Sequence, residues 1–262
     1  MILDELAEYA RYRVSENKKS ISENDLKQLA YSKPKGDFRF EKALRREGGA
    51  IISEVKKASP SKGIISEDFP YLSVAKEYES AGTDAISCLT EPKWFLGSDD
   101  IFREIRKAVS VPMLRKDFTV DRYQIYEAKV MGADAVLLIC AILNEKELLE
   151  YLAQCDSLGL SALVETHSHS EIETAVRCGA RIIGVNNRDL RDFSVNTSTA
   201  LNLRSSIPDN AVFVAESGVQ TPQDGAALIN GGANAVLIGE ALMRSADKKK
   251  FITELRENAA RN

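Results

Sequence analysis

The 262-residue sequence is poor in the residues that hold metals and form disulfides. It has two histidines, His167 and His169, and no cysteine or acidic residue is obviously placed with them as a metal-ligand set. Its four cysteines never form a C-x-x-C pair, and Cys88 and Cys140 lie within apolar runs. We therefore predict no metal, and small buried thiols in a reducing compartment.

Long apolar runs and a strong net charge are also missing. No stretch approaches the roughly 18 apolar residues of a transmembrane helix. The first segment, MILDELAEYARYR, is acidic and amphipathic, without the apolar centre or cleavage site of a signal peptide. A formal net charge of −4 gives no bulk attraction for nucleic acid or membrane. We predict a cytoplasmic protein that binds neither, and in which local positive groups hold any anionic ligand.

A repeat of glycine followed by an apolar run organises the chain. It occurs four times at nearly equal spacing, beginning at Gly82, Gly132, Gly179 and Gly232. The glycine suits the left-handed residue that ends many helices, and the apolar run suits a strand buried on both faces. Four further strands are predicted between these units, at 50–56, 111–117, 160–165 and 211–216.

Helices are predicted between the strands, for example at 121–132, 144–159 and 221–231, with Asp121, Asn144 and Thr221 as N-caps. Strands that alternate with helices indicate a parallel sheet, and eight such units favour a closed (β/α)8 barrel. No strand-linked G-x-G-x-x-G is present, which disfavours a dinucleotide fold.

The first 49 residues lie outside this alternation. They are predicted to form a helical extension that caps the bottom of the barrel or borders its mouth, with helices at 1–18, 22–31 and 39–47. We predict that residues 1–262 form one barrel domain, of which 1–49 is this extension.

Charged residues stand at the predicted strand ends, where barrels of this class carry their reacting groups. Alternation along each strand places four of them on faces shared with apolar residues: Glu54, Lys56, Lys116 and Glu165. Burying charges is costly unless they are paired or used. A structural ion-pair network explains any one of these residues, but all four together favour a reactive site at the mouth.

A phosphate site is predicted after the last two strands, where such barrels often bind phosphate. Ser217-Gly218 follows one strand, and Gly239-Glu240 follows the other and opens a helix. Glycines let backbone N–H groups approach an anion, and a helix N-terminus favours negative charge. The side chain of Glu240 would repel an anion, so we expect only its N–H to contribute. Ser59, Ser61 and Lys62 in the first loop are candidate helpers.

Taken together, the strand ends resemble those of the indole-3-glycerol-phosphate synthase family. The matching stretches follow the family's order across about residues 48–245: IISEVKKASPSKG (51–63), CLTEPKWFLGSDD (88–100), VPMLRKDF (111–118), LVET (163–166), IGVNNRDL (183–190), VAESGV (214–219) and VLIGEALMR (236–244). The resemblance implies the substrate 1-(2-carboxyphenylamino)-1-deoxyribulose 5-phosphate, which would yield indole-3-glycerol phosphate, carbon dioxide and water without a metal or redox cofactor.

The resemblance also implies roles for the strand-end residues. Lys116 is the candidate general acid, provided that neighbouring cations and partial burial lower its pKa. Lys56 is expected to pair with the substrate carboxylate and to act as acid in the later dehydration. Glu165 is the candidate base for proton removal or the stabiliser of cationic intermediates. Glu54 is expected to orient both lysines, and Asn186 to hold substrate hydroxyls.

The remaining expected contacts bind the substrate. They comprise Ser59, Ser217, Gly218, Gly239 and Glu240 at the phosphate, Glu216 at the hydroxyls, Arg188 as added positive potential, and Phe118 and Leu137 on the walls. The loop 59–66 is expected to close over the substrate. Trp94-Phe95 either lines this pocket or packs within its loop.

Other functions are compatible with the same residues. One is a Schiff-base aldolase with Lys116 as nucleophile, and a second is a related barrel isomerase of the same pathway. A third is a catalytically idle partner subunit that has kept the phosphate site. The sequence does not decide between a monomer and association with other tryptophan-pathway enzymes.

Overall fold

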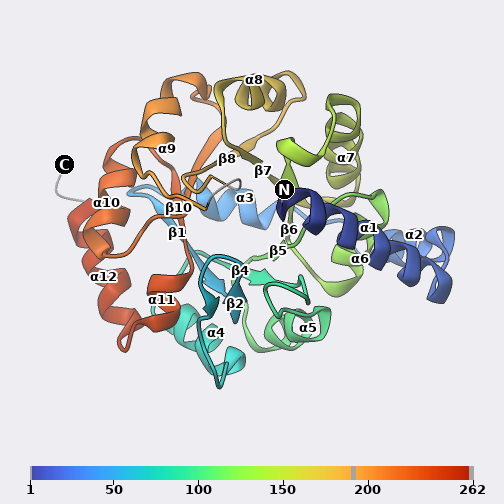
Figure 1. Cartoon of the computed structure of the whole chain (residues 1–262), viewed down its shortest axis with the longest axis horizontal. Coiled ribbons are helices and arrows are strands. Elements are labelled where there is room, and N and C mark those ends of the chain that lie inside the picture. Colours follow the sequence, from blue (N-terminus) through green and yellow to red (C-terminus); the bar gives the residue numbers. More distant parts are fainter. Residues whose placement is uncertain (1, 190–192, 260–262) are drawn as a thin grey trace.

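The computed structural model describes residues 2–189 and 193–259, and its centre is a closed barrel of parallel strands (Figure 1). The barrel closes because β1 pairs with both β4 and β10. The predicted (β/α)8 architecture is therefore confirmed. The eight barrel strands are β1 (Ala50–Val55), β4 (Ala85–Leu89), β5 (Met113–Lys116), β6 (Ala135–Ile139), β7 (Ser161–Thr166), β8 (Ile182–Asn186), β9 (Val212–Glu216) and β10 (Ala235–Ile238).

Helices surround this barrel (Figure 1). The predicted caps at Asp121, Asn144 and Thr221 each accept the expected backbone N–H and form complete capping boxes. The surrounding helices are α4 (Tyr71–Ser80), α5 (Asp99–Ala108), α6 (Arg122–Met131), α7 (Glu145–Leu158), α8 (His169–Arg177), α9 (Ser198–Leu203), α10 (Pro222–Asn230), α11 (Glu240–Arg244) and α12 (Lys248–Ala259), with short 3-10 turns η1 (Cys140–Ile142) and η2 (Arg204–Ser206).

Side-chain alternation along the strands separates two apolar layers. Ile52, Leu114 and Leu163 pack together inside the barrel, whereas Ile51 and Val55 pack in the layer between the strands and the outer helices. The faces expected to point inward do so. Charged residues one step further along these faces therefore reach the mouth of the barrel.

The N-terminal extension serves both ends of the barrel. It consists of α1 (Ile2–Ser20), α2 (Glu23–Ser32) and α3 (Arg39–Leu44). The first turns of α1 reach the cavity at the mouth. At the opposite end, the backbone N–H of Glu41 in α3 donates to Ser161 Oγ at the start of β7, at 3.2 Å. Both expected positions are occupied, each by a different helix.

The linker between α2 and α3 touches the barrel through two glycines. The backbone N–H of Gly36 donates to the carbonyl oxygen of Leu158 at 3.1 Å. A Cβ atom at Gly36 would lie 2.2 Å from the oxygen of Gly159, and one at Gly159 would lie 2.0 Å from the oxygen of Gly36. Two backbones thus meet where no side chain fits.

Two features depart from the sequence expectations. A short antiparallel hairpin of β2 (Ala58–Ser59) and β3 (Gly63–Ile64) forms within the loop after β1. The helix predicted to end at residue 47 ends at Leu44, and Gly48 and Gly49 follow with φ of 79° and 84°. Over residues 2–189 and 193–259, no helix combines the length and apolar character needed to span a bilayer.

Candidate active site

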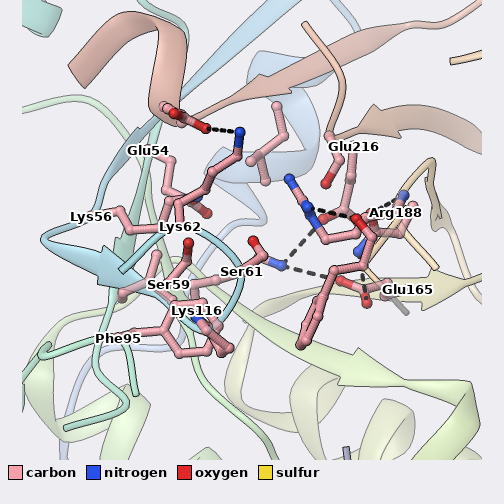
Figure 2. Close-up of a pocket in the computed structure, with 18 of the residues that line it drawn as sticks. Glu54, Lys56, Ser59, Ser61, Lys62, Phe95, Lys116, Glu165, Arg188 and Glu216 are labelled. Atoms are coloured by element: carbon pink, nitrogen blue, oxygen red, sulfur yellow. Dashed lines mark hydrogen bonds and ion pairs between the residues drawn. The ribbon is translucent and has the colours of Figure 1, made fainter. Parts of the chain in front are cut away.

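A cavity of about 440 Å³ opens at the carboxyl ends of the barrel strands (Figure 2). All fourteen residues that the sequence nominated line this one space. They are Glu54, Lys56, Ser59, Lys116, Phe118, Leu137, Glu165, Asn186, Arg188, Glu216, Ser217, Gly218, Gly239 and Glu240. The structure therefore brings the nominated residues together, and their individual roles stay predictions.

Lys116 ends β5 at the centre of the cavity. Its Nζ lies 3.1 Å from Glu165 Oε2 and 3.2 Å from Glu216 Oε2. Burial lowers the pKa of Lys116, but the two carboxylates outweigh it and hold this pKa above its ordinary value. The expectation that nearby cations lower the pKa of Lys116 is wrong, because its nearest charged neighbours are anions.

Glu54 and Lys56 form a second pair on β1 and the loop that follows it. Lys56 Nζ lies 2.7 Å from Glu54 Oε1, and Ser87 Oγ donates to Glu54 Oε2 at 3.2 Å. Burial raises the pKa of Glu54, and Lys56 and Lys116 together bring it below its ordinary value. A Cβ atom at Gly239 would lie 2.7 Å from Glu54 Oε1 and 2.8 Å from Lys56 Nζ, so this glycine makes room for the pair.

Glu165 is the penultimate residue of β7, and both of its carboxylate oxygens are engaged. Oε2 faces Lys116, and Oε1 accepts a hydrogen bond from Asn186 Nδ2 at 3.2 Å. Asn186 in turn accepts the backbone N–H of Arg188 on its Oδ1 at 3.0 Å. Burial raises the pKa of Glu165, but Lys116 and His167 lower it more, so this carboxylate is ionised at neutral pH.

Glu216 ends β9 in a different electrostatic state. Burial raises its pKa to about 7, with Glu165 adding to the rise and Lys116 opposing it. Its Oε1 has no hydrogen-bond partner among the described residues. This oxygen occupies the space over Gly184, where a Cβ atom would lie 2.2 Å away. One of the three central carboxyl groups thus retains its proton to higher pH than the other two.

The turns after β9 and β10 form the far wall of the cavity. Ser217 and Gly218 are left-handed, with φ of 64° and 93°. The carboxylate of Glu240 lies 3.2 Å from Arg244 Nε and 3.9 Å from Lys62 Nζ, which reaches across from the first loop (Figure 2). Its charge is therefore partly balanced by two cations, and glycine-containing turns present backbone at this wall.

Comparison with known proteins gives the family. A family model described as indole-3-glycerol phosphate synthase matches residues 3–255. The chain belongs to the indole-3-glycerol phosphate synthase family. Synthases of this name from Ruminiclostridium cellulolyticum and Lacticaseibacillus casei are 51% and 48% identical to it, each over 99% of this chain and 100% of their own length.

Solved structures support the fold alone. A thiamine phosphate pyrophosphorylase from Pyrococcus furiosus aligns with a TM-score of 0.62 at 16% identity, over 83% of this chain and 98% of its own. A 3-hexulose-6-phosphate synthase aligns with a TM-score of 0.61 at 16% identity, over 80% of this chain and 99% of its own. Both align over the barrel, and neither is named an indole-3-glycerol phosphate synthase.

Glu91 is a supporting residue that the sequence analysis did not single out. Its buried carboxylate accepts the backbone N–H groups of Lys93, Trp94 and Phe95 at 2.9, 2.7 and 2.9 Å. This arrangement turns Phe95 into the cavity, 6.1 Å from the Phe118 ring, while Trp94 packs against α1. The open question about Trp94-Phe95 is answered differently for the two residues. An acidic residue two positions after a strand was the only signal for Glu91.

Asp117 and Arg13 form a second unforeseen support. Arg13 in α1 holds Asp117 through two contacts, Nη2 to Oδ1 at 2.6 Å and Nη1 to Oδ2 at 3.1 Å. Thr90 Oγ1 donates to the same carboxylate at 2.7 Å. Asp117 directly follows Lys116, so this contact anchors helix α1 of the N-terminal extension beside Lys116. Because the two residues lie 104 positions apart, no local sequence pattern signals their contact.

The two histidines differ in their exposure. His169 is exposed at the start of α8, but His167 is mostly buried beside Glu165. Among residues 2–189 and 193–259, no group of three or more histidine, cysteine or acidic side chains is placed to hold a metal ion. Leu190, the last residue of the stretch 183–190, lies outside the described residues.

Proposed function

We propose that the cavity at the barrel mouth is the active site of an indole-3-glycerol phosphate synthase, a carbon–carbon lyase of tryptophan biosynthesis. The observation that carries this proposal is the convergence of Lys56, Lys116, Glu54 and Glu165 on one space of about 440 Å³. The reaction closes the indole ring of 1-(2-carboxyphenylamino)-1-deoxyribulose 5-phosphate with loss of carbon dioxide and water.

The substrate carries a carboxylate and a phosphate at opposite ends, and the cavity offers a different environment for each. Lys56 pairs with the carboxylate and positions the ring. The turns at Ser217-Gly218 and Gly239-Glu240 receive the phosphate, supported by Ser59 and Arg188 at the cavity wall. The side chains of Phe118 and Leu137 supply apolar contact, and Asn186 and Glu216 hold hydroxyl groups.

Condensation forms the carbon–carbon bond between the ring carbon that bears the carboxylate and the ketone carbon. As electrons move onto the ketone oxygen, Lys116 donates a proton to it. Its raised pKa keeps the donor charged until the developing alkoxide, a much stronger base than an amine, draws the proton away. Holding the two carbons together is the larger contribution, worth about 7–11 kcal/mol in favourable cases.

Decarboxylation and dehydration follow in the same cavity. The bond to the departing carbon dioxide breaks and its electrons restore the aromatic ring. Lys56 then protonates the leaving hydroxyl, and Glu165 removes a proton from the neighbouring methylene to form the indole double bond. Because Lys116 Nζ lies 3.1 Å from Glu165, that proton can return directly to Lys116. One proton from water then restores Lys56, which balances the carboxylate lost as carbon dioxide.

The same geometry disfavours a Schiff-base aldolase. That chemistry needs a neutral lysine amine, and Lys116 lies between two carboxylates that favour its ammonium form. Borohydride with a sugar phosphate is expected to leave the protein unlabelled. Covalent trapping on Lys116 would instead favour the aldolase.

The direct test is turnover of the proposed substrate, followed by indole fluorescence. We expect Lys116→Ala to lower kcat by about 10²–10⁴-fold, because it removes the general acid. Lys107→Ala is the control, since Lys107 is exposed on α5 away from the cavity. Thermal denaturation of both variants and of Lys116→Arg, which keeps a positive charge between Glu165 and Glu216 but is a much weaker acid, separates lost chemistry from repulsion between the two carboxylates. Near-full turnover by Lys116→Ala would refute the assigned role.

We also propose a cytoplasmic location and a single domain spanning residues 1–262. The free state of all four cysteines supports a reducing compartment. Sedimentation velocity of the purified protein, alone and mixed with other tryptophan-pathway enzymes, distinguishes a monomer from an assembly with those enzymes.

A further inference from the structure

His167 is a mostly buried titratable residue for which the reaction scheme above has no use. It directly follows β7, and its side chain is 18% exposed. The ring does not line the cavity, so it does not reach the substrate directly. Both of its ring nitrogens are buried and lack a hydrogen-bond partner within the part of the chain that the structure describes. A buried donor left without a partner is costly, so this placement calls for a reason.

Two carboxylates flank the ring. Nε2 lies 3.5 Å from Glu165 Oε1, and Nδ1 lies 3.5 Å from Glu171 Oε2. Glu171 is fixed in turn, because its Oε2 accepts the backbone N–H of His167 at 2.8 Å. The ring thus bridges a carboxylate on α8 and the carboxylate that the mechanism uses as base. A small shift at either side converts these approaches into hydrogen bonds.

The charges around the ring are predominantly negative. Glu165 from β7, Glu171 from α8 and Glu216 from β9 all act on His167, and Lys116 lies beyond Glu165. Burial lowers the pKa of His167, but the carboxylates raise it above its ordinary value. The imidazolium form, with a donor on each nitrogen, is the one that suits both neighbours.

We propose that His167 is a positioning residue for the synthase reaction, holding Glu165 Oε1 from outside the cavity while Lys116 holds Oε2 from inside. This inference rests on the proposed function, in which Glu165 is the base. Lys116 and Asn186 donate hydrogen bonds to Oε2 and Oε1 of Glu165, and His167 Nε2 approaches Oε1 at 3.5 Å, so three side chains surround this one carboxylate. A carboxylate held in this way cannot rotate away from the substrate methylene as charge moves in the cavity.

The pairing also sets the pH range in which the base works. A charged His167 lowers the pKa of Glu165 and keeps it ionised. Removing that charge raises the pKa of Glu165, so protonation removes the base at higher pH than in the wild type. The acid limb of the kcat profile is therefore expected to move to higher pH when His167 is replaced by a neutral residue.

The first test needs no activity. The chain has two histidines, so its imidazole NMR signals resolve into two titrations, which His169→Gln assigns. We expect the pKa of His167 to fall in Glu165→Gln and in Glu171→Gln, because each substitution removes a carboxylate that raises it. A His167 titration that ignores both substitutions would overturn the pairing, whether or not the protein turns over the substrate.

The second test is kinetic. We expect His167→Leu to lower kcat about tenfold or more, with KM within about twofold, because the base loses its alignment but the substrate contacts remain. His167→Asn keeps a neutral donor and should recover most of kcat at alkaline pH, while retaining the shifted acid limb. His169→Gln is the matched control and should behave as the wild type. Profiles of both His167 variants that superimpose on the wild type would refute the proposal.

Discussion

Burial and neighbouring charge give the three central glutamates different ionisation states within one cavity. Glu54 and Glu165 have lowered pKa values because lysines face them, whereas the pKa of Glu216 is raised to about 7. The folded protein therefore retains a proton on Glu216 at pH values where the unfolded chain has released it, since the ordinary value is 4.5. The contribution of Glu216 to the unfolding free energy is therefore present at low pH and declines as pH rises towards 7.

Glu216→Gln should remove that decline, because glutamine does not ionise. Relative to the wild type, the variant is expected to gain unfolding free energy between pH 5 and pH 8, by up to about 3 kcal/mol. Urea denaturation of both proteins at the two pH values measures the difference. An identical difference between variant and wild type at both pH values would contradict the raised pKa of Glu216.

At the level of single residues, strand-end position and the family resemblance together nominated the cavity lining. Glu54, Lys116 and Glu165 were found because charge at the end of a buried strand is costly without a use. The sign of the pKa change at Lys116 was not foreseeable, because it depends on which of several glutamates stand within contact distance. The burial of His167 depended in the same way on packing between β7 and α8.

Among the elements, the loop after β4 owes its shape to one buried carboxylate. Replacing Glu91 with glutamine leaves one acceptor oxygen for three backbone N–H groups and removes the charge. We expect Glu91→Gln to cost about 1–3 kcal/mol of unfolding free energy. We also expect a higher KM, because Phe95 loses its place in the cavity.

Thermal denaturation and substrate saturation curves measure the two effects of Glu91→Gln. Glu104→Gln on α5 is the control, since Glu104 is exposed and bonds only Tyr71 among the residues described. A variant that lost stability without any rise in KM would show that the loop does not position Phe95 for the substrate.

Helix α1 depends on the contact between Arg13 and Asp117. Arg13→Met leaves the buried Asp117 carboxylate with Thr90, with the backbone N–H of Phe118 and with Arg115, whose Nη2 lies 3.7 Å away. Since Arg115 remains, we expect Arg13→Met to lower the unfolding free energy by about 2–4 kcal/mol. This is somewhat less than the cost of breaking an isolated buried ion pair. Chemical denaturation tests this, and Lys19→Met on the exposed face of the same helix should leave the unfolding midpoint unchanged. Equal midpoints for the two variants would show that the contact does not anchor α1.

The regular elements were predictable because their signals are local. N-cap residues and apolar periodicity located α6, α7 and α10, and the glycine repeat located half of the strands. The hairpin of β2 and β3 was missed because two-residue strands carry no periodicity. It also depends on a distant partner, since Ala58 donates its backbone N–H to the Phe95 carbonyl oxygen at 3.3 Å.

On the scale of the whole molecule, three of the four thiols are buried as predicted, and Cys140 is partly exposed instead. Cys88, Cys155 and Cys178 are buried, and burial raises the pKa of the partly exposed Cys140 to about 12. Thiolate is the reactive form, so a disulfide reagent such as DTNB should label the native protein slowly at pH 7 and all four cysteines in denaturant. Rapid stoichiometric labelling of the native protein would show that one thiol is accessible and ionised.

Architecture was the most predictable property of the molecule. Eight alternating units admit few arrangements of parallel strands, so the closed barrel followed from their number. Two positions for the extension were compatible with the sequence, because its helices have similar amphipathic patterns. Contacts with distant strand ends, such as Arg13 with Asp117 and Glu41 with Ser161, decide which helix lies at which end.

The backbone contact between Gly36 and Gly159 limits how this protein can be altered. The backbone of each glycine occupies the space that a side chain on the other would need. Neither glycine can therefore be replaced alone while these two backbone segments stay in contact. An extension transplanted from a relative will dock only if it brings a glycine at position 36 and finds one at position 159. Libraries that vary the linker between α2 and α3 should hold both positions constant, because substitution there separates the extension from the barrel it covers.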